Sequence, residues 1–236
     1  MIHYHGTPIT PKTELYNMRG RHFCTSFSHP ADAEDCLAIG QSNVWDNGGY
    51  PAFTQGKPIT DWNPFYTWVE PKLGHPNWGV VPDVIGGSVD QQRALVKQWP
   101  FGKRCAGVVW HMNMPTKYLL ELIDAGWGYI CFGSAGEYWQ VGSDAWRDRA
   151  YEAFNCIVLT FQEIPWVHML RGLNMRGQEF PFASGDSTNV GMNYRRNYAP
   201  APKGCAEIMA REIDGTQCPL KWQVRPTQGN LLDEVA

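Results

Sequence analysis

Short apolar segments alternate with helix signals along most of this chain, and this alternation limits the possible folds more than any other feature of the sequence. Strands that alternate with helices favour a parallel sheet. The eight strand candidates are Ile2–His5, Phe23–Phe27, Val44–Asp46, Trp78–Pro82, Cys105–Trp110, Trp127–Phe132, Trp166–Leu170 and Phe182–Gly185. This pattern predicts an α/β protein built as a compact (β/α)8 TIM-like barrel. A doubly wound open sheet is the alternative, but no GxGxxG-type loop marks a first strand–helix turn.

The predicted helices carry start and stop signals. Pro30 opens a helix that Gly40 can close. Ser88 and Gln91 have the spacing of a capping box, and Ser143 is placed to cap the helix that follows it. Further helices are predicted at 63–70, 115–126 and 205–213. No segment has the composition of a linker, so we expect a single catalytic barrel domain over 1–236, with a short C-terminal tail from about 226.

Composition narrows the class of protein. The chain has 236 residues, of which 18% are charged, and a formal net charge of −3. No apolar run approaches the roughly 20 residues that span a bilayer, and the N-terminus lacks a signal-peptide pattern. We therefore expect a cytoplasmic protein with no membrane contact. A slightly acidic chain has no general affinity for nucleic acid, so such a contact would need a local basic patch.

Acidic side chains gather at one end of the predicted barrel. Asp46, Asp83 and Asp186 each lie at or just beyond a strand end, as do His111 and Gly133–Glu137. In a (β/α)8 barrel these C-terminal strand ends converge on one mouth. Two carboxylates across a cleft suit displacement at a sugar anomeric carbon, one as nucleophile and the other as acid and base. Unlike surroundings would let one of them stay protonated near neutral pH. Taken alone, the first acid would suit a simple turn cap equally well.

The motifs at these strand ends resemble those of the tRNA-guanine transglycosylases. Asp46–Tyr50 (DNGGY) resembles the DSGGFQ segment of that family, and Val109–His111 (VWH) lies where the family has a VQGG strand. Gly133–Glu137 (GSAGE) resembles its GLAVGE loop, one residue shorter. Ser184–Thr188 (SGDST) stands where the family keeps its nucleophile, in FDCVxPTR.

The closer likeness is to the bacteriophage-encoded branch of this superfamily, which inserts 7-deazaguanine derivatives into DNA. His5–Pro8 (HGTP), Pro82–Gly86 (PDVIG) and Asp186–Asn189 (DSTN) follow the order of motifs in that branch. The resemblance runs through about Asn193 and so covers most of the chain.

This resemblance implies a DNA-guanine transglycosylase, a pentosyltransferase that exchanges guanine in DNA for a 7-deazaguanine derivative. Asp186 would be the nucleophile on C1′, Asp46 the acid and base, and Tyr50 a stacking partner of the purine. The substrate-binding set that it implies is Asp83, His111, Gly133, Ser134, Gly136, Glu137, Tyr50, Gly48 and Gly49. The partners would be DNA and a free 7-deazaguanine base, in the host cytoplasm if the chain is phage-encoded.

The chain departs from the family pattern in three ways. His111 stands in place of a glutamine. The CxCxxC…H zinc site of the tRNA enzymes is missing, and Cys205 and Cys218 have no third thiol close by, so we expect neither structural zinc nor another cofactor. The chain is also shorter than the tRNA enzymes, which fits a DNA substrate better than tRNA.

A basic track for a polynucleotide backbone is expected in the last third of the chain. Tyr194 and Tyr198 are interleaved with the basic residues, so this stretch would line a groove for phosphates. A solvated basic loop is the alternative. The predicted nucleic-acid-binding residues are Arg171, Arg176, Arg195, Arg196 and Lys203.

Two other functions are open to a barrel with these acids. A glycoside or nucleoside hydrolase would use the same two carboxylates, with water as the second acceptor. A non-catalytic barrel would use the acids only to hydrogen-bond a base or nucleoside. Fold alone does not decide between them, because barrels host many chemistries.

Overall fold

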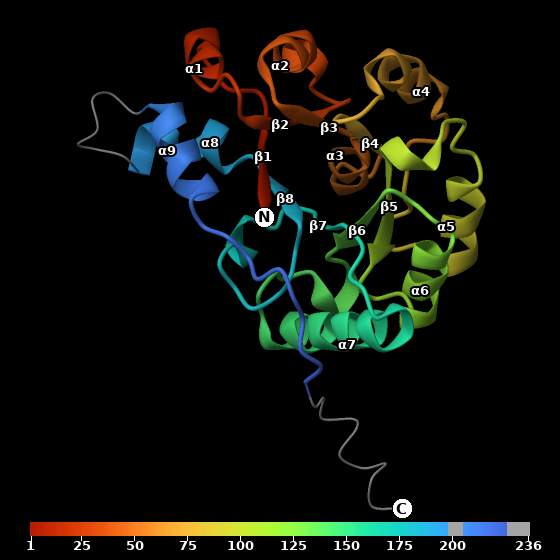
Figure 1. Ribbon diagram of the computed structural model, residues 1–236. Coiled ribbons are helices and arrows are strands. Elements are labelled where there is room, and N and C mark those ends of the chain that lie inside the picture. The colour runs from red at the N-terminus through yellow and green to blue at the C-terminus, as the bar shows by residue number, and fades with distance from the viewer. Residues whose placement is uncertain (198–204, 226–236) are drawn as a thin grey trace, which may run out of the picture.

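The computed structural model describes residues 1–197 and 205–225. Among these residues, eight parallel strands close into a barrel in chain order, with helices around it (Figure 1). The strands are β1 (Ile2–Gly6), β2 (His22–Ser26), β3 (Ser42–Asp46), β4 (Trp78–Val80), β5 (Ala106–His111), β6 (Tyr129–Gly133), β7 (Val167–Met169) and β8 (Ser184–Ser187). The predicted (β/α)8 barrel is therefore confirmed. The tail expected from about 226 lies outside the described residues.

Helices of unequal length cover the outside of the barrel. The α-helices are α1 (Lys12–Asn17), α2 (Ala33–Ile39), α3 (Gly49–Thr54), α4 (Asn63–Val69), α5 (Val89–Val96), α6 (Thr116–Asp124), α7 (Asp144–Phe161), α8 (Asn189–Asn197) and α9 (Ala206–Asp214). The 3₁₀ turns are η1 (Pro30–Asp32), η2 (Glu70–Lys72), η3 (Lys103–Cys105), η4 (Gly136–Tyr138) and η5 (Leu173–Met175). α9 contacts α1 and α8, so elements from the two ends of the chain lie side by side (Figure 1).

The cap signals in the sequence identify several helix starts. Ser88 accepts a hydrogen bond from the backbone N–H of Gln91, and the Gln91 side chain accepts one from the N–H of Ser88, which completes the capping box. Ser143 caps α7 by accepting a hydrogen bond from the N–H of Trp146. Pro30 opens the 3₁₀ turn η1 instead of an α-helix, and α2 begins directly after that turn.

The sequence does not predict two of the helices. Gly48 has a left-handed φ of 76°, and Gly49 then begins α3 where we expected only a turn. α8 occupies Asn189–Asn197, which overlaps the stretch where we expected a groove for phosphates, with a solvated basic loop as the alternative. Neither segment carries a sustained run of apolar residues at helical spacing, so the pattern that identifies the other helices is missing.

The alternation of side chains along each strand decides which residues enter the barrel. Every second strand residue points away from the barrel interior and packs against the helices. These residues belong to two larger buried clusters of apolar side chains. Asp46, His111 and Gly133 stand two positions beyond buried inward residues of β3, β5 and β6, so they face inward at the C-terminal mouth. The buried cluster of the barrel interior consists of Tyr4, Val44, Trp78, Val80, Val109 and Cys131.

Candidate active site

A pocket of about 590 Å³ lies at the C-terminal mouth of the barrel, within the described residues. This is the end at which (β/α)8 enzymes bind their substrates. The volume is in the range of pockets for small organic ligands. The residues predicted for the site that line this pocket are Asp46, Tyr50, Asp83, His111, Gly133, Ser134, Gly136, Arg171 and Asp186.

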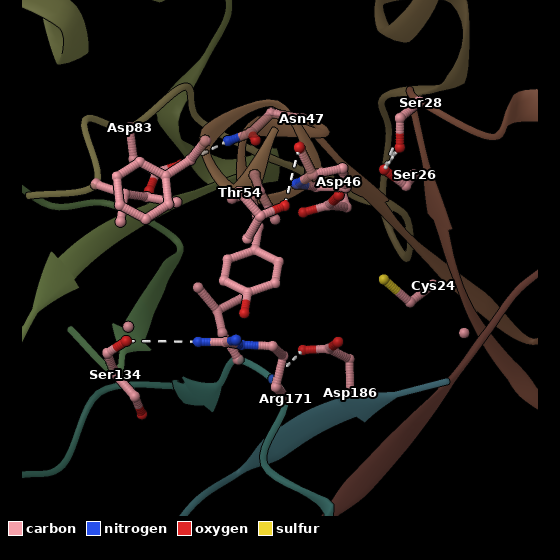
Figure 2. A pocket seen from close by; sticks show the side chains of 18 of the residues that line it. Cys24, Ser26, Ser28, Asp46, Asn47, Thr54, Asp83, Ser134, Arg171 and Asp186 are labelled. Atoms are coloured by element: carbon pink, nitrogen blue, oxygen red, sulfur yellow. Dashed lines mark hydrogen bonds between the residues drawn. The ribbon is translucent and has the colours of Figure 1, made fainter. Parts of the chain in front are cut away.

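Asp46 is the last residue of β3 and enters the pocket from one side (Figure 2). Its Oδ2 accepts a hydrogen bond from the backbone N–H of Gly48 at 3.0 Å. Burial raises the pKa of Asp46 to about 6, and the charges of Asp186 and Asp83 act in the same direction, while hydrogen bonds from Ser26 and Gly48 act against it. A carboxyl group with this pKa can both give and take a proton near neutral pH.

Asp186 enters the pocket from the opposite side (Figure 2). It lies within β8, one residue before the strand ends, and not beyond the strand as the sequence suggested. Its Oδ1 accepts a hydrogen bond from the backbone N–H of Arg171 at 2.9 Å and lies 3.2 Å from Nε2 of His168. The Asp186 side chain is 16% exposed. The Arg171 N–H and the imidazole beside this oxygen hold the carboxylate in one orientation toward the pocket.

Asp83 forms a third acidic position, in the segment after β4. Its Oδ1 accepts a hydrogen bond from Nδ2 of Asn47 at 2.9 Å, and its Oδ2 lies 2.9 Å from Nε2 of His111. Asn47 also accepts a hydrogen bond from the N–H of Gly49 through its Oδ1, at 2.7 Å. Asn47 therefore ties the start of α3 to Asp83, a role that the sequence does not reveal.

Gly133 makes room for the imidazole of His111. A Cβ at this position would lie 2.8 Å from Nδ1 of His111, closer than a Cβ can approach, and 3.0 Å from Cγ1 of Val109, a tight contact. His111 itself is only 3% exposed. The glycine is thus needed for the ring to sit beside β6 at the wall of the pocket.

Arg171 lies at the pocket, where it joins three elements. Its guanidinium is 4.0 Å from the centroid of the Tyr50 ring, on α3. Its Nη2 donates a hydrogen bond to the carbonyl oxygen of Ser134, at 3.4 Å (Figure 2). Its backbone has a φ of 56°, which is unusual for a residue with a side chain. The left-handed turn directs the Arg171 N–H at Asp186, as described above.

Three predicted substrate-binding residues do not line the pocket. Glu137 is exposed on η4. Gly48 and Gly49 are absent from the pocket lining, and their N–H groups donate to the side chains of Asp46 and Asn47. These glycines shape the turn into α3 and present no free N–H to a ligand.

The basic residues predicted to bind a nucleic-acid backbone are dispersed. Arg176 donates to the carbonyl oxygen of Leu173, next to η5. Arg195 lies on α8, where it hydrogen-bonds the Tyr194 hydroxyl and the carbonyl oxygen of Thr10. Arg196 is exposed on the same helix, and Lys203 and Tyr198 lie outside the described residues.

Tyr194 does not line the groove that the sequence predicts for phosphates. It lies on α8 and is only 3% exposed, within the cluster that packs α8 and α9 against the barrel. Its hydroxyl donates to the carbonyl oxygen of Thr10 at 2.6 Å. The ring therefore stabilises the position of α8 and offers no face for a base to stack on.

The pocket also contains residues that the sequence does not single out. Cys24 lines it, but burial raises the pKa of its thiol well above the ordinary value, with the charges of Asp186 and Asp46 adding to the effect, so it is a poor nucleophile. Phe53 and Trp139 line its rim with exposed fractions of 51% and 68%. Exposed aromatic side chains beside a strand-end mouth are a signal that only the folded chain displays.

Within residues 1–197 and 205–225, no group of three or more His, Cys, Asp or Glu side chains is arranged to hold a metal ion. No helix in this part of the chain is both long and apolar enough to cross a membrane. Comparisons with protein-family models, with curated proteins and with solved structures find no match to this chain.

Proposed function

We propose that this chain is a base-exchange transglycosylase that replaces guanine in DNA with a 7-deazaguanine derivative. One observation carries the proposal: two carboxyl groups with unlike surroundings, Asp46 and Asp186, face the same pocket from opposite sides (Figure 2). Asp46 holds its proton up to a pH of about 6, whereas Asp186 accepts a hydrogen bond from the Arg171 N–H and lies beside Nε2 of His168. Exchange at an anomeric carbon needs one group of each kind.

In the first half of the reaction Asp186 attacks C1′ of the nucleotide. A bond forms between its carboxylate oxygen and C1′, the C1′–N9 bond breaks, and the electron pair of that bond goes to the purine. Asp46 in its protonated form gives a proton to the departing guanine. The sugar is then held as an ester of Asp186, while Asp46 is a carboxylate.

In the second half the incoming base takes the place of guanine. Asp46 accepts the proton from N9 of this base, and N9 forms a new bond to C1′ as the bond to Asp186 breaks. Both carboxyl groups return to their starting states, so the proton that Asp46 gave is recovered. The steps use no cofactor, and the rate of each depends on how well the two acids are positioned.

The base would be recognised by the part of the pocket wall that contains Asp83 and Tyr50. Asp83 presents a carboxylate to the pocket, as an acceptor for the N–H groups on the Watson–Crick edge of guanine. Asn47 holds this carboxylate in place through a hydrogen bond to Oδ1, and Nε2 of His111 lies 2.9 Å from Oδ2. Tyr50 would stack on the purine from the α3 side, with the guanidinium of Arg171 on its ring.

The partner would be DNA in the cytoplasm, with the target nucleotide extruded or in a single strand, because C1′ of a stacked nucleotide does not reach a pocket of this kind. Of the described residues predicted to contact the backbone, Arg171 lines the pocket, and Arg195 and Arg196 are exposed on α8. The acidic mouth binds the reacting sugar and base, so phosphates would be held farther out.

The test is incorporation of radiolabelled guanine into DNA and tRNA, assayed side by side. We expect label in DNA with the wild-type chain and none with Asp186→Ala. The control is Asp148→Asn, which removes an exposed carboxylate of α7 away from the pocket and should leave exchange unchanged. Release of guanine without exchange would favour a hydrolase. Tight binding of a base with neither release nor exchange would favour a non-catalytic binding barrel.

A further inference from the structure

A row of three hydrogen-bonding side chains, those of Trp166, Ser184 and His168, lies behind Asp186, away from the pocket. The indole Nε1 of Trp166 donates to the Ser184 hydroxyl at 2.7 Å. The same hydroxyl lies 2.8 Å from Nδ1 of His168. Nε2 of His168 lies 3.2 Å from Oδ1 of Asp186. His168 and Ser184 are both 0% exposed, so water does not reach either side chain.

The chemistry of these groups sets the direction of each hydrogen bond. An indole N–H can only donate, so Ser184 accepts from Trp166 and has its own hydrogen left to give. If that hydrogen points at Nδ1 of His168, every polar atom in the row is satisfied. If Nδ1 carried the proton instead, the buried hydroxyl hydrogen would lose this partner, and the Nε2 lone pair would face the carboxylate of Asp186. Both effects disfavour that tautomer.

Aromatic side chains hold the His168 ring in place. The rings of Tyr4 and Trp78 meet it edge-on, with centroid distances of 5.9 and 5.1 Å. Tyr4 and Trp78 are themselves joined, because the Tyr4 hydroxyl accepts a hydrogen bond from Nε1 of Trp78 at 3.2 Å. The imidazole is therefore fixed within the barrel, and its Nε2 cannot swing away from Asp186 without displacing the interior cluster.

We infer that His168 is a positioning residue for Asp186, a neutral imidazole whose Nε2–H is set by Ser184 and Trp166 and is donated to the carboxylate. Its catalytic consequence rests on the proposed function. The Arg171 N–H and the His168 Nε2–H both bind Oδ1 of Asp186. Oδ2 is then the oxygen that attacks C1′, and Oδ1 becomes the carbonyl oxygen of the ester while keeping both donors.

The first experiment reads the tautomer directly and needs no activity. Protein labelled with ¹⁵N-histidine is observed by long-range proton–nitrogen NMR at neutral pH, and the His168→Gln variant identifies the His168 signals. We expect a neutral ring that carries its proton on Nε2, and a shift toward the other tautomer in Ser184→Ala. A ring protonated on Nδ1, or on both nitrogens, would overturn the inference whatever the enzyme does.

The second experiment separates positioning from folding. Single-turnover formation of the protein–DNA ester is measured at saturating DNA for His168→Leu and His168→Gln, with thermal unfolding and substrate affinity measured alongside. We expect His168→Leu to slow ester formation by about 10- to 100-fold, as loss of a supporting partner does, with little change in DNA affinity. His168→Gln keeps an N–H donor at the end of its side chain and should retain most of the rate. Equal losses in both variants would mean that the ring only fills space.

A double-mutant cycle tests the part played by Ser184. Ser184→Ala should slow ester formation in the wild-type background but add nothing in the His168→Gln background, because an amide has no tautomer to set. Additive losses would contradict the role of Ser184 in setting the tautomer of His168. If wild-type protein forms no ester with DNA or tRNA, the proposed function fails, and the NMR result still decides the protonation of His168.

Discussion

Replacing Asp46 by asparagine should make the protein more stable at neutral pH while it removes most of the activity. The side chain ends at the barrel mouth, where the pocket leaves part of it in contact with solvent and the strand ends surround the rest. Asparagine has nearly the same shape and keeps an oxygen that can accept the hydrogen bond from the Gly48 N–H. The substitution therefore removes a charge and changes little else.

The size of the effect follows from the pKa of Asp46. Burial, with the charges of Asp186 and Asp83, raises this pKa from 3.8 to about 6. At 1.36 kcal/mol for each pKa unit, the difference corresponds to about 3 kcal/mol. The folded chain binds this proton more tightly than the unfolded chain. Protonated Asp46 therefore makes its full contribution to stability below about pH 4, and this contribution is lost between about pH 4 and 6 and stays absent at higher pH.

The measurement is urea unfolding of wild type, Asp46→Asn and the exposed control Asp148→Asn between pH 4 and 8. The free energy of unfolding of Asp46→Asn should match that of wild type at pH 4 and exceed it by up to about 3 kcal/mol at pH 8. With a urea dependence of about 2 to 3 kcal/mol per molar, the midpoint should rise by about 1 M. The control variant reports the effect of removing one surface carboxylate.

Two results would refute this reasoning. A stability difference that is the same at pH 4 and pH 8 would mean that no proton is linked to folding at Asp46. A variant less stable than wild type at pH 8 would mean that the ionised carboxylate stabilises the mouth through its hydrogen bonds. Base exchange by Asp46→Asn should slow by about 10²–10⁴, in kcat more than in KM, since the proton moves only in the transition state.

Other substitutions test the remaining parts of the site. Asp186→Ala should abolish exchange and also the protein–DNA adduct that wild type shows on denaturing gels; near-normal exchange would exclude it as nucleophile. Gly133→Ala should raise KM for the base, because its Cβ would lie 2.8 Å from Nδ1 of His111, and an unchanged KM would remove His111 from base binding. Changing Arg195 and Arg196 together to alanine should weaken DNA binding and lower the salt slope by up to about two, without affecting the free base. An unchanged DNA affinity would mean that these arginines of α8 are solvated and do not contact DNA.

Some features of the candidate site are local and can be read from the chain. Side chains two residues apart on a strand point to the same side. Because Val44 points into the barrel, Asp46 does too, and Val109 has the same relation to His111. Ser88 and Ser143 cap helices because a hydroxyl can reach an N–H three residues on, whatever the rest of the chain does. Such signals need only neighbours in sequence, and for that reason they predict the barrel and the acids at its mouth.

Closure of the barrel decides the rest, because it brings together groups that no local pattern connects. The sequence predicts Arg171 only as a phosphate ligand. In the folded chain its left-handed backbone turns its N–H to Asp186, and its guanidinium meets Tyr50 across the mouth. His168 reads as an ordinary strand residue until β7 lies beside β8 and its ring faces Asp186. The sequence by itself determines which residues form strands and which faces they present. Which side chains then meet across the mouth depends on the register of paired strands and the paths of the loops between them, and those are settled only when the whole core packs.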